Sequence, residues 1–589
     1  MRWLQNYYSS LFHNTIFKNM TLNIDKPVTR VAVIGAGAAG LAQLQQLQEA
    51  WQRGNVQSKL EVVAFETKED VGGVWLWDGA SKNSLTARVP GKDGDQVYSY
   101  PPGTENPSPM YTGLRTNIPA PLMAYRGFEF PEGTHLFPES SVVLKYLQDF
   151  ATAYDLRQYV RFNTQVERVH LSPPGSSRRW TIESAPSKSG EGEKKREEFD
   201  FVSVSNGHYA DGWIPAIKGL STFPGEIVHS RYYHSPPLLA PKTILIVGSF
   251  ASGGDISRLV AGYDLDKYSP SGEPLPGQSG EGKGFVKIYV SSSGATMFSP
   301  ASESAWGKYL KQKPLVSHID PPSPTHPKGV IHFQPPPSSE EGTPAPVSDE
   351  PIDDVDLILF ATGYNFAYPF FKSTDQPWDG KSVVDGVIRE EERQGGDERE
   401  VGGLKGLTPR NLDELLMFHK GDRSLAFLVL PYQMIPFPFA QVQARLSSLL
   451  WAGLLPSFPA HPTLPPNASN PYQQEEESPA PVPASNPDPY PNPTASGTST
   501  PGASNTYTTS SAETPSKPST RKMMQVRRQL LFGAPYEWDY SEFLMGIMAE
   551  ADAGEGGEGK KVEEHWKKIE PFRRELREQT DLKKRTLGY

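Results

Sequence analysis

The sequence predicts an α/β fold with two parallel sheets, and three observations support this class. Short β-branched runs alternate with helical stretches from about Thr29 onward, as in parallel α/β architectures. Two of these runs lead into glycine-rich turns, one at Gly35 and one at Gly248. The chain has 589 residues, more than one ordinary core accommodates. Together these features predict two dinucleotide-binding (Rossmann-like) domains with loop insertions between their elements.

Composition excludes several classes of function. The chain has no cysteine, which rules out disulfides, cysteine-ligated zinc, iron–sulfur clusters and the flavoprotein disulfide reductases. The net charge is -10 and there is no dense basic run, so nucleic acid is not an expected partner. No metal-ligand spacing such as His-x-x-x-His is recognisable, and no metal is predicted. No apolar run approaches the roughly 18 residues of a membrane-spanning helix.

The first glycine-rich turn has the context of a nucleotide site. Residues 30–34 are predicted to form a buried strand and residues 41–50 a helix, with the turn between them. Gly35 permits the tight turn, Gly37 lets a pyrophosphate approach the backbone, and Gly40 lets the helix pack on the strand. The N-terminus of the helix supplies free amides and the positive end of its dipole.

The strand that follows this helix ends in an acid. Residues 60–65 are predicted to form a second strand, and Glu66 comes directly after it. A carboxylate at this point accepts hydrogen bonds from ribose hydroxyls, and it favours the unphosphorylated ribose of FAD or NAD. A glycine pair comes next and suggests close approach of the backbone to a ligand. This segment consists of Gly72, Gly73, Val74 and Trp75.

The second glycine-rich turn departs from the first at one position. Residues 243–247 are predicted to form a buried strand that leads into Gly248, but Phe250 stands where the second glycine is expected. A helix begins directly afterwards, and its N-terminus still offers amides to a phosphate. The candidate cofactor-binding residues here are Gly248, Ser252, Gly253, Gly254 and Asp255.

The next strand, predicted at residues 285–290, ends in Ser291 and not in an acid. The missing carboxylate removes repulsion toward a 2′-phosphate, and the serine hydroxyl can donate to it, which favours NADP here. Lys287 and Arg258 are further candidate phosphate partners, although ordinary surface charges are the more common use of such residues. Two nucleotide units in one chain indicate a two-cofactor oxidoreductase, in which the nicotinamide reduces a flavin.

Composition also divides the chain into segments. The sequence predicts a leader at 1–27, an FAD domain at 28–215 and 366–460, and an NADP domain at 216–365 inserted between its two parts. Residues 461–520 are rich in proline and poor in apolar side chains, which predicts disorder. Residues 521–589 are expected to return to the core and to end in a charged helical tail. The leader is basic and partly apolar, which leaves a peripheral membrane contact open.

Three stretches inside the predicted domains have the composition of insertions. They lie at residues 187–198, 269–284 and 321–351. The first is charged and is expected to be a hairpin excursion. The third contains many prolines, but residues 329–333 within it are apolar enough for a strand.

A motif between the two units identifies the chain with a known family. Phe223, Gly225, His229 and Tyr233 match every fixed position of F-x-G-x-x-x-H-x-x-x-[YF]. With it the chain resembles the flavin-containing monooxygenases, as a fungal-like member, over about residues 28–460. Related Baeyer–Villiger enzymes typically carry tryptophan at the position of Tyr233, so the motif favours oxygenation of nitrogen or sulfur. Further stretches agree in order, at 72–75, 114–119, 205–209, 356–364 and 436–456.

The resemblance implies an enzyme with FAD and NADPH as cofactors. NADPH would reduce the flavin, reduced flavin would form a C4a-hydroperoxide with O2, and a small thiol, sulfide or amine would take one oxygen atom. By motif match Thr116 and Asn117 lie beside the flavin, and Asn117 has the catalytic role of holding NADP+ and the oxygenated flavin. Gln443 is expected to place a helix near the flavin ring, and His229 and Tyr233 to organise the domain connection. The expected location is the cytoplasm, with peripheral contact to the endoplasmic reticulum left open.

Two other interpretations stay open. A Baeyer–Villiger or N-hydroxylating enzyme of the same two-domain build would act on ketones or primary amines. A flavin-binding protein without turnover would serve as an interaction scaffold through its proline-rich segment and charged tail. Phe250 leaves this second interpretation open, because it puts the geometry of the pyridine-nucleotide turn in doubt.

Overall fold

The computed structural model describes residues 27–53, 56–77, 108–187, 193–215, 217–234, 242–262, 287–294, 296, 298–300, 306–335, 348–372, 374–378, 384–385, 404–406, 408–409, 411–467, 530–553, 564–579, 581–582 and 586. The leader up to residue 26, the insertion at 269–284 and the proline-rich segment beyond residue 467 lie outside the described residues. The expectations for those segments stay predictions.

The first sheet has six strands in the order β20-β21-β7-β1-β2-β3. All neighbours run parallel except β20 and β21, which are antiparallel. The strands are β1 (Val28–Ile34), β2 (Lys59–Phe65), β3 (Val160–Arg161), β7 (Phe201–Val204), β20 (Phe418–His419) and β21 (Asp422–Phe427). β1 and β2 contain the strands predicted at 30–34 and 60–65, and β1 leads into the first glycine-rich turn.

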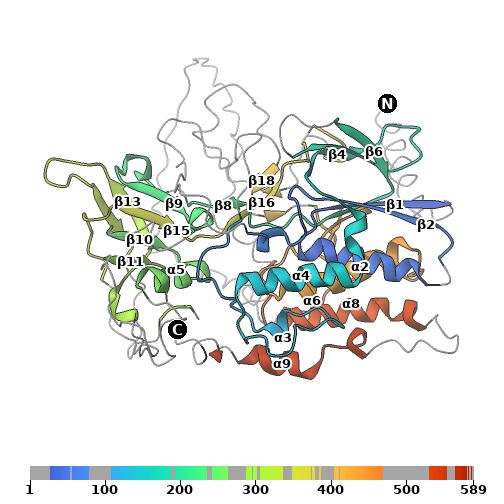
Figure 1. Ribbon diagram of the computed structural model, residues 1–589. Helices are drawn as coiled ribbons and strands as arrows, with labels where there is room; N and C mark the ends of the chain where they lie inside the picture. Colours follow the sequence, from blue (N-terminus) through green and yellow to red (C-terminus); the bar gives the residue numbers. More distant parts are fainter. Residues whose placement is uncertain are drawn as a thin grey trace, which may run out of the picture.

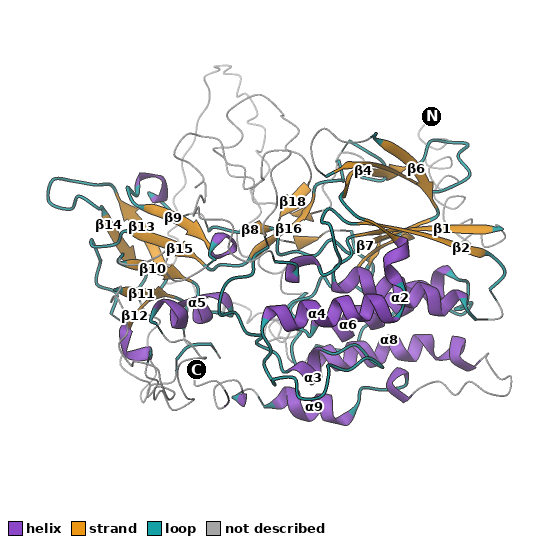
Figure 2. Ribbon diagram, in the orientation of Figure 1, coloured by secondary structure: helices purple, strands orange, loops and turns teal. Residues whose placement is uncertain are grey.

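Helices cover one face of this sheet, and an antiparallel meander covers the other (Figures 1 and 2). The helices are α2 (Ala38–Trp51), α4 (Ser140–Ala153) and α6 (Pro436–Trp451), and the meander consists of β4 (Thr164–Leu171), β5 (Trp180–Pro186) and β6 (Lys195–Phe199). β5 and β6 pair antiparallel, as expected for a hairpin excursion at 187–198.

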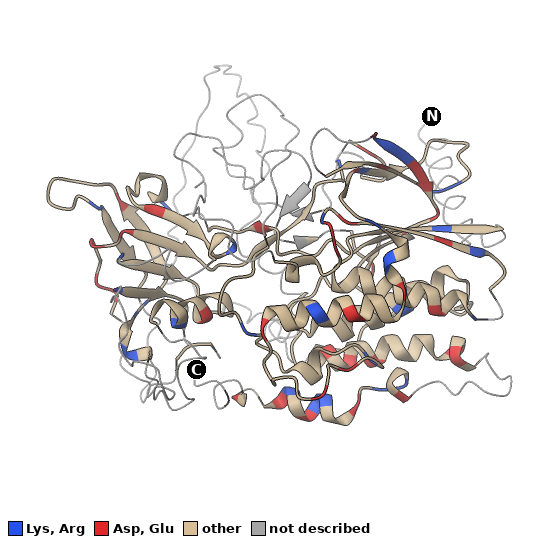
Figure 3. Ribbon diagram, viewed as in Figure 1, with Lys and Arg blue, Asp and Glu red and all other residues tan. Residues whose placement is uncertain are grey.

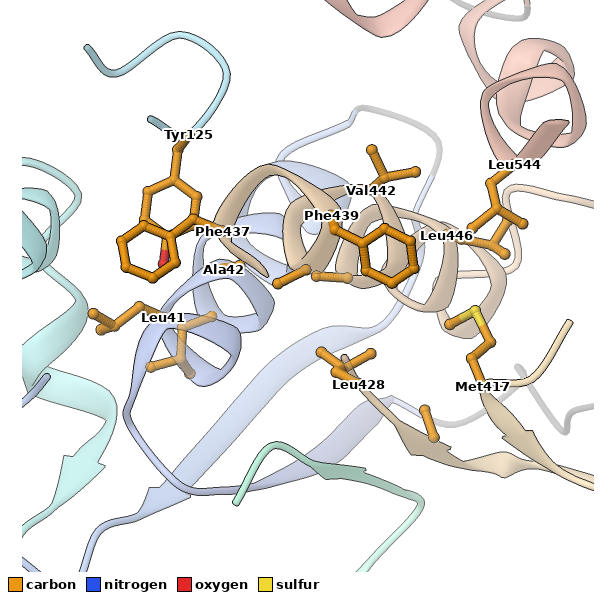
Figure 4. Close-up of a cluster of buried hydrophobic side chains, with 14 of the residues drawn as sticks. Leu41, Ala42, Tyr125, Met417, Leu428, Phe437, Phe439, Val442, Leu446 and Leu544 are labelled. Atoms are coloured by element: carbon orange, nitrogen blue, oxygen red, sulfur yellow. The ribbon is translucent and has the colours of Figure 1, made fainter. Parts of the chain in front are cut away.

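The largest core lies between this sheet and its helices. Figure 4 shows part of it, where Leu41 of α2 lies near Phe437 and Tyr125, and Phe439 and Leu446 of α6 lie near Leu544. All residues of α6 after its first are buried, and polar ones among them hydrogen-bond inside the core, as Gln441 does to Arg126, Gln443 to Tyr540 and Ser447 to Gln43. The helix that follows the first glycine-rich turn packs on α6, which fixes the turn against the sheet.

The second sheet has five strands, all parallel, in the order β12-β11-β10-β15-β9. The strands are β9 (Glu226–His229), β10 (Ile244–Val247), β11 (Ile288–Ser291), β12 (Leu310–Lys313) and β15 (Leu357–Phe360). Helix α5 (Ser252–Val260) packs on one face, and a hairpin of β13 (Val316–Asp320) and β14 (Val330–Phe333) packs on the other. The strand expected at 329–333 is thus present.

The second sheet interrupts the first along the chain. Strands of the first sheet come from residues 28–204 and 418–427, and those of the second from residues 226–360. Between the two sheets lies a small antiparallel sheet, labelled in Figure 1. Its strands are β8 (Asp211–Gly212), β16 (Tyr364–Tyr368) and β18 (Leu404–Gly406), and a separate pair is formed by β17 (Val384–Asp385) and β19 (Thr408–Pro409).

The C-terminal segment returns to the first core. The Tyr432 N–H donates to the carbonyl of Leu530 at 2.7 Å, and the Phe532 N–H donates to that of Tyr432 at 3.0 Å. Helix α8 (Tyr536–Ala553) packs on α6, and α9 (Pro571–Glu578) packs on α3 (Ala120–Met123). The short 3-10 helices are η1 (Gly73–Trp75), η2 (Leu156–Tyr159), η3 (Leu220–Thr222), η4 (Ser230–Tyr232), η6 (Gly307–Tyr309) and η8 (Glu564–Trp566).

The prediction of disorder from residue 461 is wrong for residues 461–467. Leu464 packs against the first core. The buried Asn467 donates from Nδ2 to the carbonyl of Leu531 at 2.9 Å. These contacts with the first core and the returning segment, together with that of His461 Nδ1 to the Glu414 carboxylate at 3.2 Å, hold a stretch whose average composition is that of a disordered chain. In the described part of the chain, no helix is both long and apolar enough to cross a membrane.

Candidate active site

The two glycine-rich turns share the conformation of their first glycine and the contact that joins helix to strand. Gly35 follows β1 with a φ of 100°, and Gly248 follows β10 with a φ of 100°. A Cβ on Gly40 would lie 1.9 Å from the carbonyl oxygen of Gly35, and a Cβ on Gly253 would lie 1.9 Å from that of Gly248. No side chain fits at that distance from a backbone atom. Each helix therefore starts in contact with its strand, and both turns present a helix N-terminus at the carboxyl edge of a parallel sheet.

The predicted glycine pair lies directly beside the first turn. The Gly72 N–H donates to the carbonyl of Ala36 at 3.1 Å. A Cβ on Gly37 would stand 3.3 Å from the Cα of Gly73, and a Cβ on Gly73 would stand 2.9 Å from the Cα of Gly37. Two backbones thus touch at this point, which explains why both positions are glycine.

The rest of this segment forms η1 against the first core. The carbonyl of Val74 accepts a hydrogen bond from the Ser108 hydroxyl. Trp75 stands edge-on to Phe437, with ring centroids 6.4 Å apart. The Lys68 ammonium donates to the carbonyl of Gly73 at 2.8 Å. Sequence reasoning missed Lys68, because nothing in its spacing shows that it reaches the 3-10 helix.

Glu66 closes the first turn from the end of β2. The side chain is 6% exposed. Its Oε2 accepts from the Ala36 N–H at 2.8 Å, and its Oε1 accepts from the Lys68 N–H at 3.0 Å. The carboxylate predicted to bind a ribose therefore also holds the turn itself, through charge-assisted hydrogen bonds to two backbone amides.

Replacing Glu66 by Gln should lower the free energy of unfolding by about 1–3 kcal/mol, because one buried amide loses a charged acceptor. Thermal and urea unfolding measure this change. Glu61→Gln is the matched control, since Glu61 lies on the same strand with a side chain that is 47% exposed. An equal effect of both substitutions would show that Glu66 does not stabilise the turn.

Thr116 and Asn117 lie on the segment that leads into α3. The Thr116 N–H donates to the carbonyl of Pro138 at 3.0 Å, and its buried Oγ1 has no hydrogen-bond partner among the described residues. Asn117 is exposed. Beyond α3, the Tyr125 hydroxyl donates to the carbonyl of Ala38 at 2.6 Å. The segment is thus tied to the first turn of α2, next to the glycine-rich turn.

The second turn keeps its contact between glycines despite Phe250, but its backbone differs from that of the first turn at the next residue. Ala251 has a φ of 43° and precedes α5, whereas α2 begins at the equivalent position, Ala38. The Phe250 ring is 48% exposed and stands edge-on to Phe298 at a centroid distance of 5.1 Å. A Cβ on Gly254 would lie 2.5 Å from the carbonyl oxygen of Phe298, so this glycine allows the Phe298 loop to pack on the helix. The half-buried Ser252 begins α5. The ring of Phe250 therefore leaves the contact between Gly248 and Gly253 intact.

Asp255 does not stand free at the helix N-terminus. It is 4% exposed, with Oδ2 accepting from the Tyr111 hydroxyl at 2.8 Å and Oδ1 accepting from Arg258 at 3.0 Å. Arg258 is fully buried, so its expected use as a surface charge is wrong. Arg258 can be buried because Asp255, one helical turn earlier, neutralises its guanidinium group. This cluster links α5 to residues 108–114, the segment that precedes Thr116.

Ser291 is positioned differently from the prediction. It is the last residue of β11, fully buried, and its hydroxyl donates to the carbonyl of Pro314 at 2.7 Å. Pro314 directly follows strand β12, which the polar sequence at 310–313 did not reveal. Lys287 forms an exposed ion pair with Asp354, as expected for a surface charge. Lys313, opposite Ser291 in the register, is a buried cation that sequence reasoning missed.

Gln443 joins helices of the first core. Its Oε1 accepts from the Val429 N–H at 2.9 Å, and its Nε2 donates to the Tyr540 hydroxyl at 3.0 Å. The side chain is fully buried. Its placement of a helix beside a flavin stays a prediction, while its contacts tie α6 to the returning helix α8.

His229 and Tyr233 lie where the two sheets meet. The His229 Nδ1 accepts from the Arg231 N–H at 3.1 Å, and its Nε2 lies 2.9 Å from the carbonyl of Gly363. These partners require the neutral tautomer with hydrogen on Nε2. A Cβ on Gly212 would lie 2.5 Å from the His229 ring, so this glycine makes room for it. Tyr233 is fully buried. His229 therefore contacts the connections between the sheets, and the Tyr233 ring packs on Tyr111 with centroids 5.4 Å apart.

The pKa of His229 is lowered to about 4, mainly by burial and also by the charge of Arg231, and the Gly363 hydrogen bond opposes this shift. The stabilising contribution of the neutral ring is present above pH 6.5 and is lost as the pH falls toward 4. Between pH 7 and pH 5, we expect the free energy of unfolding to fall by about 2 kcal/mol more in the wild type than in His229→Gln. Urea unfolding at both pH values measures this difference. Parallel pH curves for the two proteins would contradict it.

Comparisons with known proteins agree on what this chain is similar to. The family model described as flavin-binding monooxygenase-like matches residues 102–262. A plant relative, flavin-containing monooxygenase FMO GS-OX5 of Arabidopsis thaliana, is 30% identical over 351 residues, which is 58% of this chain and 62% of the relative. Flavin-containing monooxygenase FMO GS-OX-like 1 of the same plant is 35% identical over 247 residues, 41% of this chain and 48% of the relative. The match thus spans less than two thirds of either relative.

A solved structure extends the likeness in fold to almost the whole chain. The S-allyl-L-cysteine S-oxygenase of Allium sativum superimposes with a TM-score of 0.58 at 22% identity, over 94% of this chain and 93% of that one. At this identity the likeness establishes the fold, a mixed α/β arrangement with parallel sheets.

Proposed function

We propose that this chain, a relative of the flavin-containing monooxygenases, is an FAD- and NADPH-dependent monooxygenase that transfers one oxygen atom of O2 to a soft sulfur or nitrogen centre. The observation that carries the proposal is the pair of equivalent glycine turns at the carboxyl edges of two parallel sheets. One nucleotide would bind at each turn, which gives two Rossmann-like domains, the second inserted into the first.

The first turn fits FAD. Gly35, Gly37 and Gly40 place no side chain between the turn and a ligand, so a pyrophosphate could reach the helix amides, and Glu66 could accept from an unphosphorylated ribose. The buried Thr116 Oγ1, which has no partner among the described residues, is free to bond a ligand. Gly73, Val74 and Trp75 would border the cofactor, and the exposed Asn117 would reach its reactive side. When bound, the flavin supplies the redox chemistry and the activation of oxygen.

The second turn fits a nicotinamide nucleotide. The amides of Ser252 and Gly254 at the start of α5 would receive the phosphates, while the Gly253 N–H donates to the carbonyl of Phe250 at 3.2 Å. β11 ends in serine, so no carboxylate repels a 2′-phosphate, which favours NADPH over NADH. Because the Ser291 hydroxyl is bonded to Pro314, this preference rests on the absence of an acid. Asp255 would act indirectly, by holding α5 against the segment that carries Asn117.

The experiment starts from purified full-length protein reconstituted with FAD. We expect one tightly bound flavin that is bleached by NADPH without air, more slowly by NADH, and reoxidised when oxygen returns. Thioethers and tertiary amines are then screened as acceptors. A protein that binds no flavin would refute the proposal. A bound flavin that NADPH leaves oxidised would favour the scaffold interpretation, and conversion of ketones would favour a Baeyer–Villiger enzyme.

A further inference from the structure

The β13–β14 hairpin carries a polar cluster that no nucleotide site uses. β13 and β14 pair antiparallel, with His318 opposite His332 and Asp320 opposite Val330. Side chains alternate between the faces of a strand, and Ile319 and Ile331 point into the core of the second sheet. His318, Asp320 and His332 therefore share the outer face. Figure 2 shows this hairpin at the end of the molecule opposite the β4–β6 meander.

The hairpin is held on both edges. The Ile319 N–H donates to the carbonyl of Lys218 at 2.9 Å, and Ile331 exchanges backbone hydrogen bonds with Ile352 at 2.8 and 3.1 Å. Its outer face is therefore a fixed platform, and groups placed on strands are more precisely positioned than groups on loops.

The three side chains converge. The Asp320 carboxylate lies 2.8 Å from His332 Nε2 and 3.9 Å from His318 Nε2. The two imidazole rings are stacked, with centroids 4.3 Å apart and planes 2° from parallel. One ligand atom from each residue lies within 4.8 Å of the other two. The side chains stay accessible, at 37% for His318, 54% for Asp320 and 28% for His332.

We propose that His318, Asp320 and His332 form a binding site for a divalent transition-metal ion, with Zn2+ as the best match. Two imidazole nitrogens and one carboxylate oxygen form the borderline donor set that zinc prefers, and they leave a position for water. Bonds of about 2.0–2.2 Å place tetrahedral ligand atoms about 3.3 Å apart, so the present separations need only small shifts. The stacked rings must turn about χ2 until their lone pairs converge, and that torsion is soft in histidine.

A bound ion would join β13 to β14 beside their connecting loop. Because the site forms only in the folded hairpin, zinc would stabilise the native state in proportion to its binding. The site shares no residue with the glycine turns, so its test is independent of the proposed redox activity. Ser317 Oγ lies 3.1 Å from His318 Nδ1 and can fix the tautomer that leaves Nε2 free.

The chain offers a matched control in the same region. His326 Nδ1 lies 2.8 Å from the Asp353 carboxylate, with side chains 45% and 53% exposed. This pair has the same His–carboxylate contact as His332 and Asp320 but lacks the second imidazole. A substitution in this pair therefore distinguishes the effect of losing an exposed ion pair from the effect of losing a chelating site.

The test is competition for Zn2+ between the chelator-treated full-length protein and a chromophoric zinc indicator. We expect one zinc ion per chain with micromolar affinity, weakened at least about tenfold in His318→Gln and in His332→Gln, and unchanged in His326→Gln. Zinc should also raise the melting temperature of the wild type but not of His332→Gln, whose zinc-free melting temperature should match the wild type. Equal affinity in all four proteins, or no binding below millimolar zinc, would overturn the proposal.

Discussion

Gly40→Ala should abolish flavin binding, whereas Gly253→Ala should leave the flavin bound and abolish its reduction by NADPH. In each variant the new Cβ would stand 1.9 Å from a carbonyl oxygen of the turn, at Gly35 or Gly248. A backbone atom cannot rotate away as a side chain can, so the helix must move off its strand. The amides meant for a pyrophosphate then move with it. The equivalent substitutions thus separate the two proposed cofactor sites.

Flavin content, measured as bound FAD per chain, and the rate of anaerobic reduction give the two readouts. Gly546→Ala is the control, because Gly546 lies in α8, is exposed and has open space where a Cβ would stand. That substitution should be neutral or stabilise by up to about 1 kcal/mol. If Gly253→Ala were reduced by NADPH at the wild-type rate, the second turn would not be the nicotinamide site.

Arg573→Ala should cost about 3 kcal/mol of unfolding free energy and loosen the segment that carries Asn117. Arg573 is fully buried, and its Nη1 donates to the carbonyls of Pro121, Leu122 and Ala124 at 3.3, 3.0 and 3.2 Å. These carbonyls belong to α3 and to the residue after it, just beyond Asn117. Loss of the guanidinium leaves the carbonyls buried without a donor.

A neighbouring cation reduces this cost. The pKa of Arg126 is lowered to about 9, mainly by burial and next by the charge of Arg573, while the charges of Glu570 and Glu542 oppose this shift. Removing Arg573 relieves the repulsion between the two guanidinium groups, so the net loss stays below the sum of the lost hydrogen bonds.

The measurements are urea unfolding and the rate at which FAD dissociates. Arg574→Ala is the matched control on the same helix, where acidic and basic positions are interspersed (Figure 3). The Arg574 side chain is 32% exposed and pairs with Glu542 at 3.0 Å, a contact worth below about 1 kcal/mol. If Arg573→Ala were as stable as Arg574→Ala and kept its flavin as long, the C-terminal helix would not position the Asn117 segment.

Local signals made the parallel strands and both turns predictable. Gly40 and Gly253 are required by contact with a carbonyl five residues earlier in the chain, and Gly35 and Gly248 have a φ of 100° that favours glycine, so local spacing reveals them. The apolar run at residues 329–333 likewise predicted the strand inside a proline-rich stretch, which is present as β14.

Contacts between distant segments were not predictable. Arg258 is buried because Asp255 pairs with it and Tyr111 closes the cluster, and the Ser291 hydroxyl is bonded because an unpredicted strand leads to Pro314. The cluster of His318, Asp320 and His332 depends on the register of a hairpin. No spacing along the chain records such a register, which explains why the sequence predicts no metal.

The most direct test of the proposed monooxygenase is the fate of oxygen in the reaction. The FAD-loaded protein is mixed with NADPH and a thioether under isotopically labelled dioxygen, and the sulfoxide is analysed by mass spectrometry. We expect one labelled oxygen atom in each sulfoxide and the other in water, with one NADPH consumed per product. Consumption of NADPH with release of hydrogen peroxide alone, for thioethers and amines alike, would contradict a monooxygenase and leave an oxidase.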